Sequence, residues 1–301
     1  MRFLVLSLII VTSLYLAESG LAQMNSANFE IRWDTLGIGG SDTASSASYQ
    51  MRDTVGNTGI GGSSSTSYDL RAGYRQGIFD QVLSFDLSVQ STNGVNATVL
   101  VGTTVTVSNT AGMSVGDTVA VIEDVGVGQS AGIGKILNIT GNDLTLDEIE
   151  TGGAPLVIDG TNDQVYRMSL SSIDFGTVNS TTLYQRLLGW EVTIDVSNGY
   201  SVFVIENQDL TSGADTIADV ADGSVNAGSE EYGAISSDAT LAGSTFDTQD
   251  TAFTGAFQEV DTEATTSFAS KDFLTVKAAI AAGTDAGDYS HTLSLIASGN
   301  F

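Results

Sequence analysis

The sequence contains no cysteine, and this absence excludes disulfides, cysteine-ligated metal sites and cysteine nucleophiles. It also excludes the lipid-modified cysteine that follows a bacterial lipoprotein leader. A chain of 301 residues is nevertheless long enough to bury hydrophobic cores without covalent cross-links. Together with the export signal described below, the missing cysteines favour a bacterial over a eukaryotic secreted protein.

Histidine is almost as scarce, because His291 is the only one in the chain. It lies in the middle of an alternating, strand-like run. A Ser-His-Asp triad would have to use this residue, and no Gly-x-Ser-x-Gly sequence accompanies it. A zinc site needs several histidine or cysteine ligands. The Gly-x-Gly stretches at 37–39 and 126–128 lack the Lys-Ser/Thr of a phosphate-binding loop.

Basic residues are few. The chain holds 10 Lys and Arg against 36 Asp and Glu, a formal net charge of −26. Such a charge repels nucleic acids and anionic membrane surfaces, so we expect neither as a partner. It suits solubility and the binding of divalent cations. Charged residues still make up only 15% of the chain, as in many extracellular β proteins with Ser-, Thr- and Gly-rich surfaces.

Only one long apolar run is present, and it opens the chain. Arg2 precedes the nearly continuous apolar stretch 3–17, and Gly20-Leu21-Ala22 offers a small-x-small cleavage pattern. We therefore expect residues 1–22 to be a signal peptide, cleaved after Ala22, and the mature protein to be secreted or held at the cell surface. An uncleaved anchor helix is the alternative. No other segment approaches the length of a transmembrane helix.

A seven-residue motif occurs three times in residues 23–80, at 26–32, 46–52 and 65–71. Its aromatic, polar, aliphatic, Arg order has a period of two and predicts a threefold repeat of short strands. The sequence GIGGS stands in both intervening stretches, so we expect Gly/Ser loops between these strands. The motif arginines form either solvated cross-strand pairs or a basic edge that docks onto the acidic remainder of another copy.

Residues 97–162 contain β-branched runs separated by Gly, Asn and Asp clusters, which predict a small β-barrel-like module. The sequences VGDTV at 115–119 and ITGNDLTL at 139–146 resemble a module common in phage and bacterial surface proteins. This resemblance implies structure rather than chemistry. We interpret the module as an insertion between two strands of one layer; a plain succession of domains is the alternative.

The flanking segments, 81–96 and 163–301, show the alternation of a β-sandwich. Trp190, Val192 and Ile194 lie at a period of two, and a turn leads into the returning strand 200–205. Repeated short strands with regular turns predict an all-β protein built on an Ig-like β-sandwich. Residues 207–268 are expected to form long acidic loops with short strands.

Five short sequences in this C-terminal part resemble a known family. They are Asp174–Val178, Gly199–Val202, Asp222–Val225, Glu230–Gly233 and Gly287–Tyr289. Over roughly 165–301 they are similar to the WxL-type sandwiches of bacterial surfaces and to the related pilin-like domains. The resemblance implies a non-catalytic assembly role at a cell surface. The family's two Trp-x-Leu signatures are absent, so the resemblance does not extend to peptidoglycan attachment.

Calcium is the cofactor that this composition favours, because it prefers oxygen ligands and offsets acidic charge. Two loops are candidates. Asp159 and Asp163 place oxygens at alternate positions of a tight turn, and Asp219 and Asp222 form a second acidic group. Neither follows the EF-hand pattern, and a solvated polar turn is the alternative for each.

These observations predict a non-catalytic secreted or cell-surface structural protein. It would assemble by β-strand pairing with other copies or with other surface proteins, and residues 23–80 would donate the strand. An adhesin-like module is the first alternative, with the acidic loops presenting Ca²⁺ or a glycan-contacting surface. A carboxylate-based glycoside hydrolase is the second, with Glu230 and Glu231 or Asp219 and Asp222 as its acids, and it predicts a concave pocket with shifted carboxyl pKa values.

Overall fold

The computed structural model describes residues 82–300, apart from 127 and 197, and six short strands between 25 and 72. The chain forms two compact units, residues 1–80 and 81–301. All regular structure among the described residues is β-strand, and every strand pair is antiparallel, which confirms the all-β prediction. The predicted leader, residues 1–22, lies outside the described residues. In the part of the chain that is described, no helix has the length and apolar character needed to cross a membrane.

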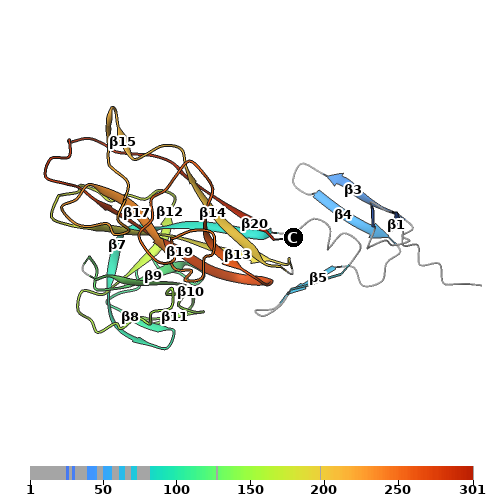
Figure 1. Cartoon of the computed structure of the whole chain (residues 1–301). Helices are drawn as coiled ribbons and strands as arrows, with labels where there is room; N and C mark the ends of the chain where they lie inside the picture. The colour runs from blue at the N-terminus through green and yellow to red at the C-terminus, as the bar shows by residue number, and fades with distance from the viewer. Residues whose placement is uncertain are drawn as a thin grey trace, which may run out of the picture. The chain divides into compact units, whose positions relative to one another are not determined.

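The first unit contains three two-stranded hairpins (Figure 1). They pair β1 (Asn25–Ser26) with β2 (Phe29–Glu30), β3 (Gly39–Ser45) with β4 (Gln50–Val55), and β5 (Gly61–Ser64) with β6 (Asp69–Ala72).

The described part of the GIGGS sequences lies in strands and not in the expected loops. Their last three residues, 39–41 and 61–63, belong to strands β3 and β5, which pair with the motif strands β4 and β6. Glycine disfavours strands, but a directly following strand-forming motif supplies the hydrogen-bonding partner that outweighs this preference. In the second and third repeats, the glycine sequence and the motif therefore make one hairpin.

The second unit is built around a sandwich of two sheets (Figure 1). One layer has the order β7 (Val82–Val101), β13 (Tyr184–Ile194), β19 (Ser267–Ala279), β17 (Glu231–Ser236). The other has the order β18 (Gln258–Glu263), β14 (Tyr200–Glu206), β20 (Leu293–Gly299).

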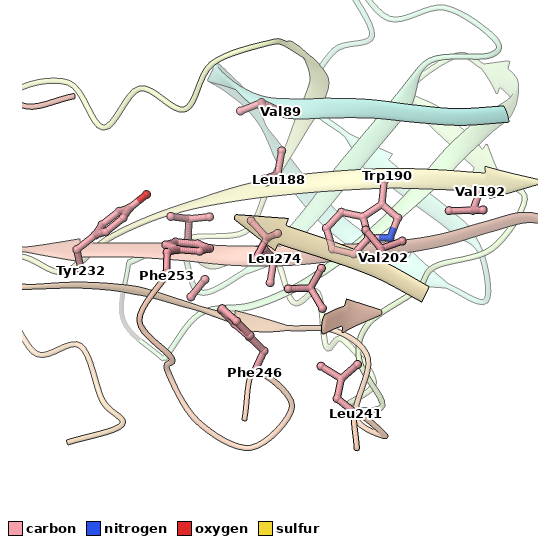
Figure 2. Close-up of a cluster of buried hydrophobic side chains, with 14 of the residues drawn as sticks. Val89, Leu188, Trp190, Val192, Val202, Tyr232, Leu241, Phe246, Phe253 and Leu274 are labelled. Carbon is pink, nitrogen blue, oxygen red and sulfur yellow. The ribbon is translucent and has the colours of Figure 1, made fainter. Parts of the chain in front are cut away.

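The two layers share one hydrophobic core (Figure 2). Trp190 and Val192 of β13 and Val202 of β14 are almost fully buried in it, as the alternation in the sequence predicts. Phe246 and Phe253 enter the same core from the chain between β17 and β18, and their ring centroids lie 5.7 Å apart. A core shared by two antiparallel layers fits the predicted β-sandwich.

Further strands form a closed ring next to the sandwich. Pairing runs from β7 through β8 (Thr104–Val107), β11 (Asp143–Leu146), β10 (Ser130–Thr140), β9 (Thr118–Glu123) and β12 (Gln164–Leu170) back to β7. Inside the ring lies a separate aliphatic core that includes Val105, Val121, Ile136 and Leu144.

Strand β7 belongs to both parts. Its first half, from Val82 to Val89, pairs with β13, and its second half pairs with β12 and β8. The domain boundary placed between 96 and 97 therefore falls inside one continuous strand. The ring and the sandwich share backbone hydrogen bonds rather than a linker.

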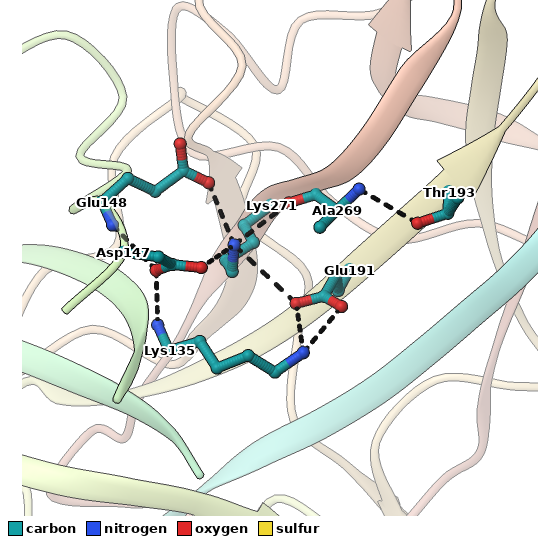
Figure 3. A network of polar contacts seen from close by, with 7 residues as sticks. All are labelled: Lys135, Asp147, Glu148, Glu191, Thr193, Ala269 and Lys271. Carbon is teal, nitrogen blue, oxygen red and sulfur yellow. Dashed lines mark hydrogen bonds and ion pairs between the residues drawn. The ribbon is translucent and has the colours of Figure 1, made fainter. Parts of the chain in front are cut away.

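A buried lysine ties the two parts together (Figure 3). Lys271 of β19 is 4% exposed, and its Nζ lies 2.8 Å from Asp147 and 3.0 Å from Glu148, both from the chain that follows β11. Lys135 of β10 reaches across to Glu191 of β13 at 2.8 Å. Burial lowers the pKa of Lys271, but its hydrogen bonds to Asp147 and Glu148 outweigh burial and raise the pKa above its usual value. Lys271 is therefore a charged residue within the junction.

Candidate functional site

A groove of about 610 Å³ opens along one side of the sandwich. Leu87 and Val89 of β7 line it from one layer, and Leu293 and Leu295 of β20 line it from the other. Tyr232 and His291 lie at one end. The groove is thus lined by two apolar strand faces together with polar groups.

The second layer has one strand fewer than the first, and the chain that follows β12, residues 171–176, also lines the groove. Leu87 lies on the same face of β7 as Val89, which is 3% exposed, yet Leu87 itself is 49% exposed. Leu293 and Leu295 also pack against the core while remaining only partly buried. A further strand beside β20 would cover these side chains.

Strand β20 is also an open edge, since among the described strands it pairs only with β14. The Asn300 N–H donates a hydrogen bond to the Gly199 carbonyl at 2.9 Å. This bond identifies which residues of β20 direct their backbone N–H and C=O groups toward β14. By antiparallel alternation, the backbone N–H and C=O groups of Leu293, Leu295 and Ala297 point away from β14. Unpaired backbone groups and a partly exposed apolar face therefore coincide on the same residues.

Three carboxylates gather close to the same end of the groove. Ligand atoms of Glu206, Asp209 and Asp219 lie within 4.8 Å of one another. Glu206 ends β14 on the face that carries Val202 and Val204, so its side chain enters the core side, and it is 6% exposed. Asp209 and Asp219 flank a small hairpin formed by β15 (Thr211–Ser212) and β16 (Asp215–Thr216).

The histidine beside this cluster is fully engaged. The Nδ1 of His291 lies 3.1 Å from the Gln208 carbonyl, and its Nε2 lies 2.8 Å from the Tyr232 hydroxyl. A carbonyl only accepts, so Nδ1 carries the hydrogen and Nε2 accepts from the hydroxyl. Burial lowers the pKa of His291, in keeping with this neutral form.

Two carboxylate oxygens in the cluster have no hydrogen-bond donor. Glu206 Oε2 and Asp219 Oδ1 are buried without a partner; Glu206 Oε2 is 3.3 Å from Nδ1 of His291, whose hydrogen is directed to Gln208. Burial, reinforced by the charges of Asp219 and Asp209, raises the pKa of Glu206 to about 7. Burial and Asp209 raise the pKa of Asp219 to about 6. Both carboxyl groups therefore hold their protons more tightly than an ordinary carboxyl group does, because no described residue beside them offsets the cost of burying their charge.

The first predicted calcium loop has a different arrangement. The carboxylate of Asp163 accepts hydrogen bonds from the backbone N–H groups of Asp124, Asp159 and Gly160, at 3.1, 2.9 and 2.9 Å. Asp159 accepts one from the Thr161 N–H at 2.8 Å. The structure thus brings Asp159 and Asp163 together, with backbone donors on their carboxylates, and these contacts shape the loop.

The second predicted pair is divided. Asp222 is exposed and accepts a hydrogen bond from the Ser224 N–H at 3.0 Å, while Asp219 joins Glu206 and Asp209 instead. Glu206 was not among the predicted ligands, although the sequence carries a signal for it: the residue continues the buried face of an alternating strand as a charged group. Asp209 carries no comparable signal, because only the path of the chain after β14 brings it near.

A second, polar cleft of about 820 Å³ lies beside the junction and is lined by Asp238, Asp261 and Asp272 among others. Burial raises the pKa of Asp261 to about 7; the hydrogen bond from Trp190 lowers this pKa, and the charge of Asp238 raises it. Burial and the charge of Asp261 raise the pKa of Asp272 to about 9. Asp261 is 1% exposed and accepts a 2.7 Å hydrogen bond from Trp190 Nε1. Its carboxyl group is thus part of the core and is closed to a substrate.

The sequence matches no protein-family model, and comparisons with curated proteins and with solved structures give no match. The groove, the open strand edge and the acidic cluster are therefore the features on which a function can be proposed.

Proposed function

We propose that this protein is a non-catalytic, secreted or cell-surface structural protein that assembles by β-strand pairing. Strand β20 and the groove beside it would accept a strand from the N-terminal repeat of a second copy. The observation that carries the proposal is the coincidence at Leu293, Leu295 and Ala297 of outward backbone groups with an incompletely covered apolar face. An added strand would satisfy both at once, with main-chain hydrogen bonds supplying affinity and alternate side chains filling the groove.

The repeat in residues 23–80 suits this role. In its motif, an aromatic residue stands two positions before an aliphatic one, as in Phe29 and Ile31, Tyr49 and Met51, and Tyr68 and Leu70. The inward residues of β20 have the same spacing. Isolated two-stranded hairpins are only marginally stable in water, and a third strand stabilises them. Among the described strands, each hairpin of the repeat is a sheet of only two strands, so it lacks this third strand.

Charge also favours residues 23–80 as the segment that fills the groove of a second copy. Residues 81–301 hold 29 acidic and 5 basic residues, so two such bodies repel each other. Residues 23–80 hold 6 acidic and 4 basic residues. The repeat is therefore the part of the chain that approaches an acidic neighbour with the smallest electrostatic cost.

The direction of the strands favours an exchange between copies. Val82 lies opposite Ile194, and Gly299 lies opposite Tyr200, so β7 begins and β20 ends at the same end of the sandwich. The β20 residues that line the groove, Leu293 and Leu295, lie nearer the other end, where Leu293 is opposite Glu206. A repeat that leaves one end and fills a groove at the other makes a head-to-tail contact, and such contacts propagate into filaments unless the rotation closes a ring.

A glycoside hydrolase is less well supported, because none of its predicted acids, Glu230, Glu231, Asp219 and Asp222, lines the groove or the polar cleft. Carboxyl groups with raised pKa values line the polar cleft, but Asp261 is enclosed between core side chains and Asp272 is 8% exposed. General acid catalysis requires a carboxyl group within hydrogen-bond reach of a bound substrate. The burial of this pair supports a structural role.

The open edge can be tested with Ala297→Pro, compared with Ala297→Ser. Proline removes an N–H that points away from β14 and leaves the ladder to β14 intact, and edge strands tolerate it. We expect the purified protein to form filaments or large particles by electron microscopy and light scattering. Ala297→Pro should reduce them while Ala297→Ser does not.

The donor strand is tested by deleting residues 23–80, since residues 81–301 form a compact unit with its own cores. This variant should remain monomeric and should bind added full-length protein. Assembly that is unchanged in both the deletion and Ala297→Pro would disprove the proposal.

A further inference from the structure

The acidic cluster has the dimensions of a cation site. Calcium binds oxygen ligands at 2.3–2.6 Å, so two ligands on opposite sides of one ion are up to about 5 Å apart. One carboxylate oxygen from each of Glu206, Asp209 and Asp219 lies within 4.8 Å of the other two. One ion can therefore contact all three residues.

Two of these residues carry oxygens that accept no hydrogen bond from the described residues. Glu206 is 6% exposed and its Oε2 has no donor, and the buried Oδ1 of Asp219 also has none. A buried carboxylate oxygen without a donor or a counter-ion is energetically costly. Nearby cations do not relieve it, because no lysine or arginine forms an ion pair with these acids among the described residues.

The donor set selects the kind of ion. All three candidate ligands offer oxygen, and both nitrogens of His291 are already hydrogen-bonded to Gln208 and Tyr232. Zinc prefers nitrogen and sulfur ligands in tetrahedral sites, whereas calcium accepts carboxylates, carbonyls and water in irregular numbers.

We infer that Glu206, Asp209 and Asp219 bind one calcium ion, with water completing its coordination. The ion would join the end of β14 to both sides of the β15–β16 hairpin, because Asp209 precedes this hairpin and Asp219 follows it. The neighbouring Leu210 and Ile217 line the groove, so the ion would also hold one end of the groove in place. The metal site does not depend on strand exchange; only this effect on the groove rests on the proposed function.

Isothermal titration calorimetry of the purified protein with calcium chloride, after treatment with a chelator, tests the site. We expect one ion per chain with a Kd of about 10⁻⁴–10⁻³ M, the range of extracellular calcium modules. Asp209→Asn and Asp219→Asn should each weaken binding by about tenfold or more, because affinity follows the number of charged ligands. Asp209 is exposed, so its replacement leaves folding intact.

Asp222→Asn is the matched control, since Asp222 is a nearby acid outside the cluster. It should bind calcium as the unmodified protein does. The inference is overturned if no binding heat is seen at millimolar calcium, or if Asp222→Asn weakens binding as much as Asp219→Asn. Ala297→Pro keeps the cluster and should bind calcium normally, so a failure of strand exchange is distinguishable from a failure of the metal site.

Discussion

The indole Nε1–H of Trp190 donates a 2.7 Å hydrogen bond to Oδ2 of Asp261 across the sandwich core. The two residues come from opposite layers, β13 and β18, so this bond fastens one sheet to the other through the interior. Asp272 of β19 lies in the same polar group and accepts a 2.8 Å hydrogen bond from the Ser237 hydroxyl. The core therefore contains two carboxyl groups whose protonation affects the stability of the fold.

Stability should fall as the pH rises through neutrality. The pKa values of Asp261 and Asp272 are raised to about 7 and about 9 in the folded protein, so the folded state binds protons more tightly than the unfolded state does. Their contribution is full below the ordinary aspartate pKa of about 3.9 and is lost as the pH passes about 7 and then about 9. Thermal melts in chelator at pH 6 and pH 9 should show a lower Tm at pH 9. Asp261→Asn, which cannot ionise, should show a smaller difference; an equal difference would assign the effect to other groups.

Removal of the buried lysine should be costly. Lys271→Met leaves Asp147, Glu148 and Glu191 without their shared cation, and loss of one partner from a buried ion pair typically costs about 3–5 kcal/mol. Denaturant unfolding of the two proteins measures this cost. Lys135→Met is the control, because Lys135 is 36% exposed and a partly solvated pair contributes about 1 kcal/mol or less. Similar losses for the two variants would contradict the role given to Lys271.

Two glycines provide a matched test of backbone strain. Gly141 and Gly199 both have a positive φ, at 63° and 72°, so alanine at either position costs about 1–2 kcal/mol. A Cβ at Gly141 meets nothing, whereas a Cβ at Gly199 would collide with the carbonyl oxygen of Glu263. Gly199→Ala should therefore lower the free energy of unfolding clearly more than Gly141→Ala. Equal losses in denaturant titrations would show that the chain near Glu263 moves aside.

Salt should promote assembly. The Debye length shrinks from about 10 Å at 0.1 M to about 3 Å at 1 M salt, which weakens repulsion between the acidic bodies. Main-chain hydrogen bonds and groove filling are little affected. Light scattering should thus show larger particles as sodium chloride is raised. Smaller particles would instead indicate that the motif arginines Arg32, Arg52 and Arg71 hold the assembly together by ion pairs with the neighbouring copy.

Much of the sandwich could be predicted from the sequence, because strands with one buried face show their period directly. The row Trp190, Val192, Ile194 and the strand that follows it are examples. The ring was predictable only as a compact β-rich segment. Its closure depends on β12 pairing with both β7 and β9, and contacts of that kind leave no local pattern.

The continuity of β7 was hidden for a specific reason. Residues 91–94 read Ser-Thr-Asn-Gly, which are typical turn residues, yet they continue the strand. Gly94 lies opposite Tyr166 of β12, and a Cβ at Gly94 would meet the tyrosine ring. An aromatic side chain from the next strand covers the glycine and keeps it in the sheet.

The candidate site, too, could be predicted from the sequence only in part. Asp219 was recognisable as a candidate ligand, but its partners Glu206 and Asp209 precede it by 13 and 10 positions and meet it only after the β15–β16 hairpin forms. Sequence proximity favoured Asp222 instead. Carboxylates are so numerous in this chain that burial, rather than residue type, distinguishes the few that can hold an ion.

The uninterrupted β7 also determines how this protein would bear mechanical load. Tension applied at Val82 runs parallel to the strand, whereas its hydrogen bonds to β13 lie across it. The bonds between Val82 and Val89 would consequently be sheared together rather than unzipped singly. Because the same strand continues into the ring, a pull at Val82 would reach both cores through one continuous strand, which would suit the head-to-tail assembly proposed above.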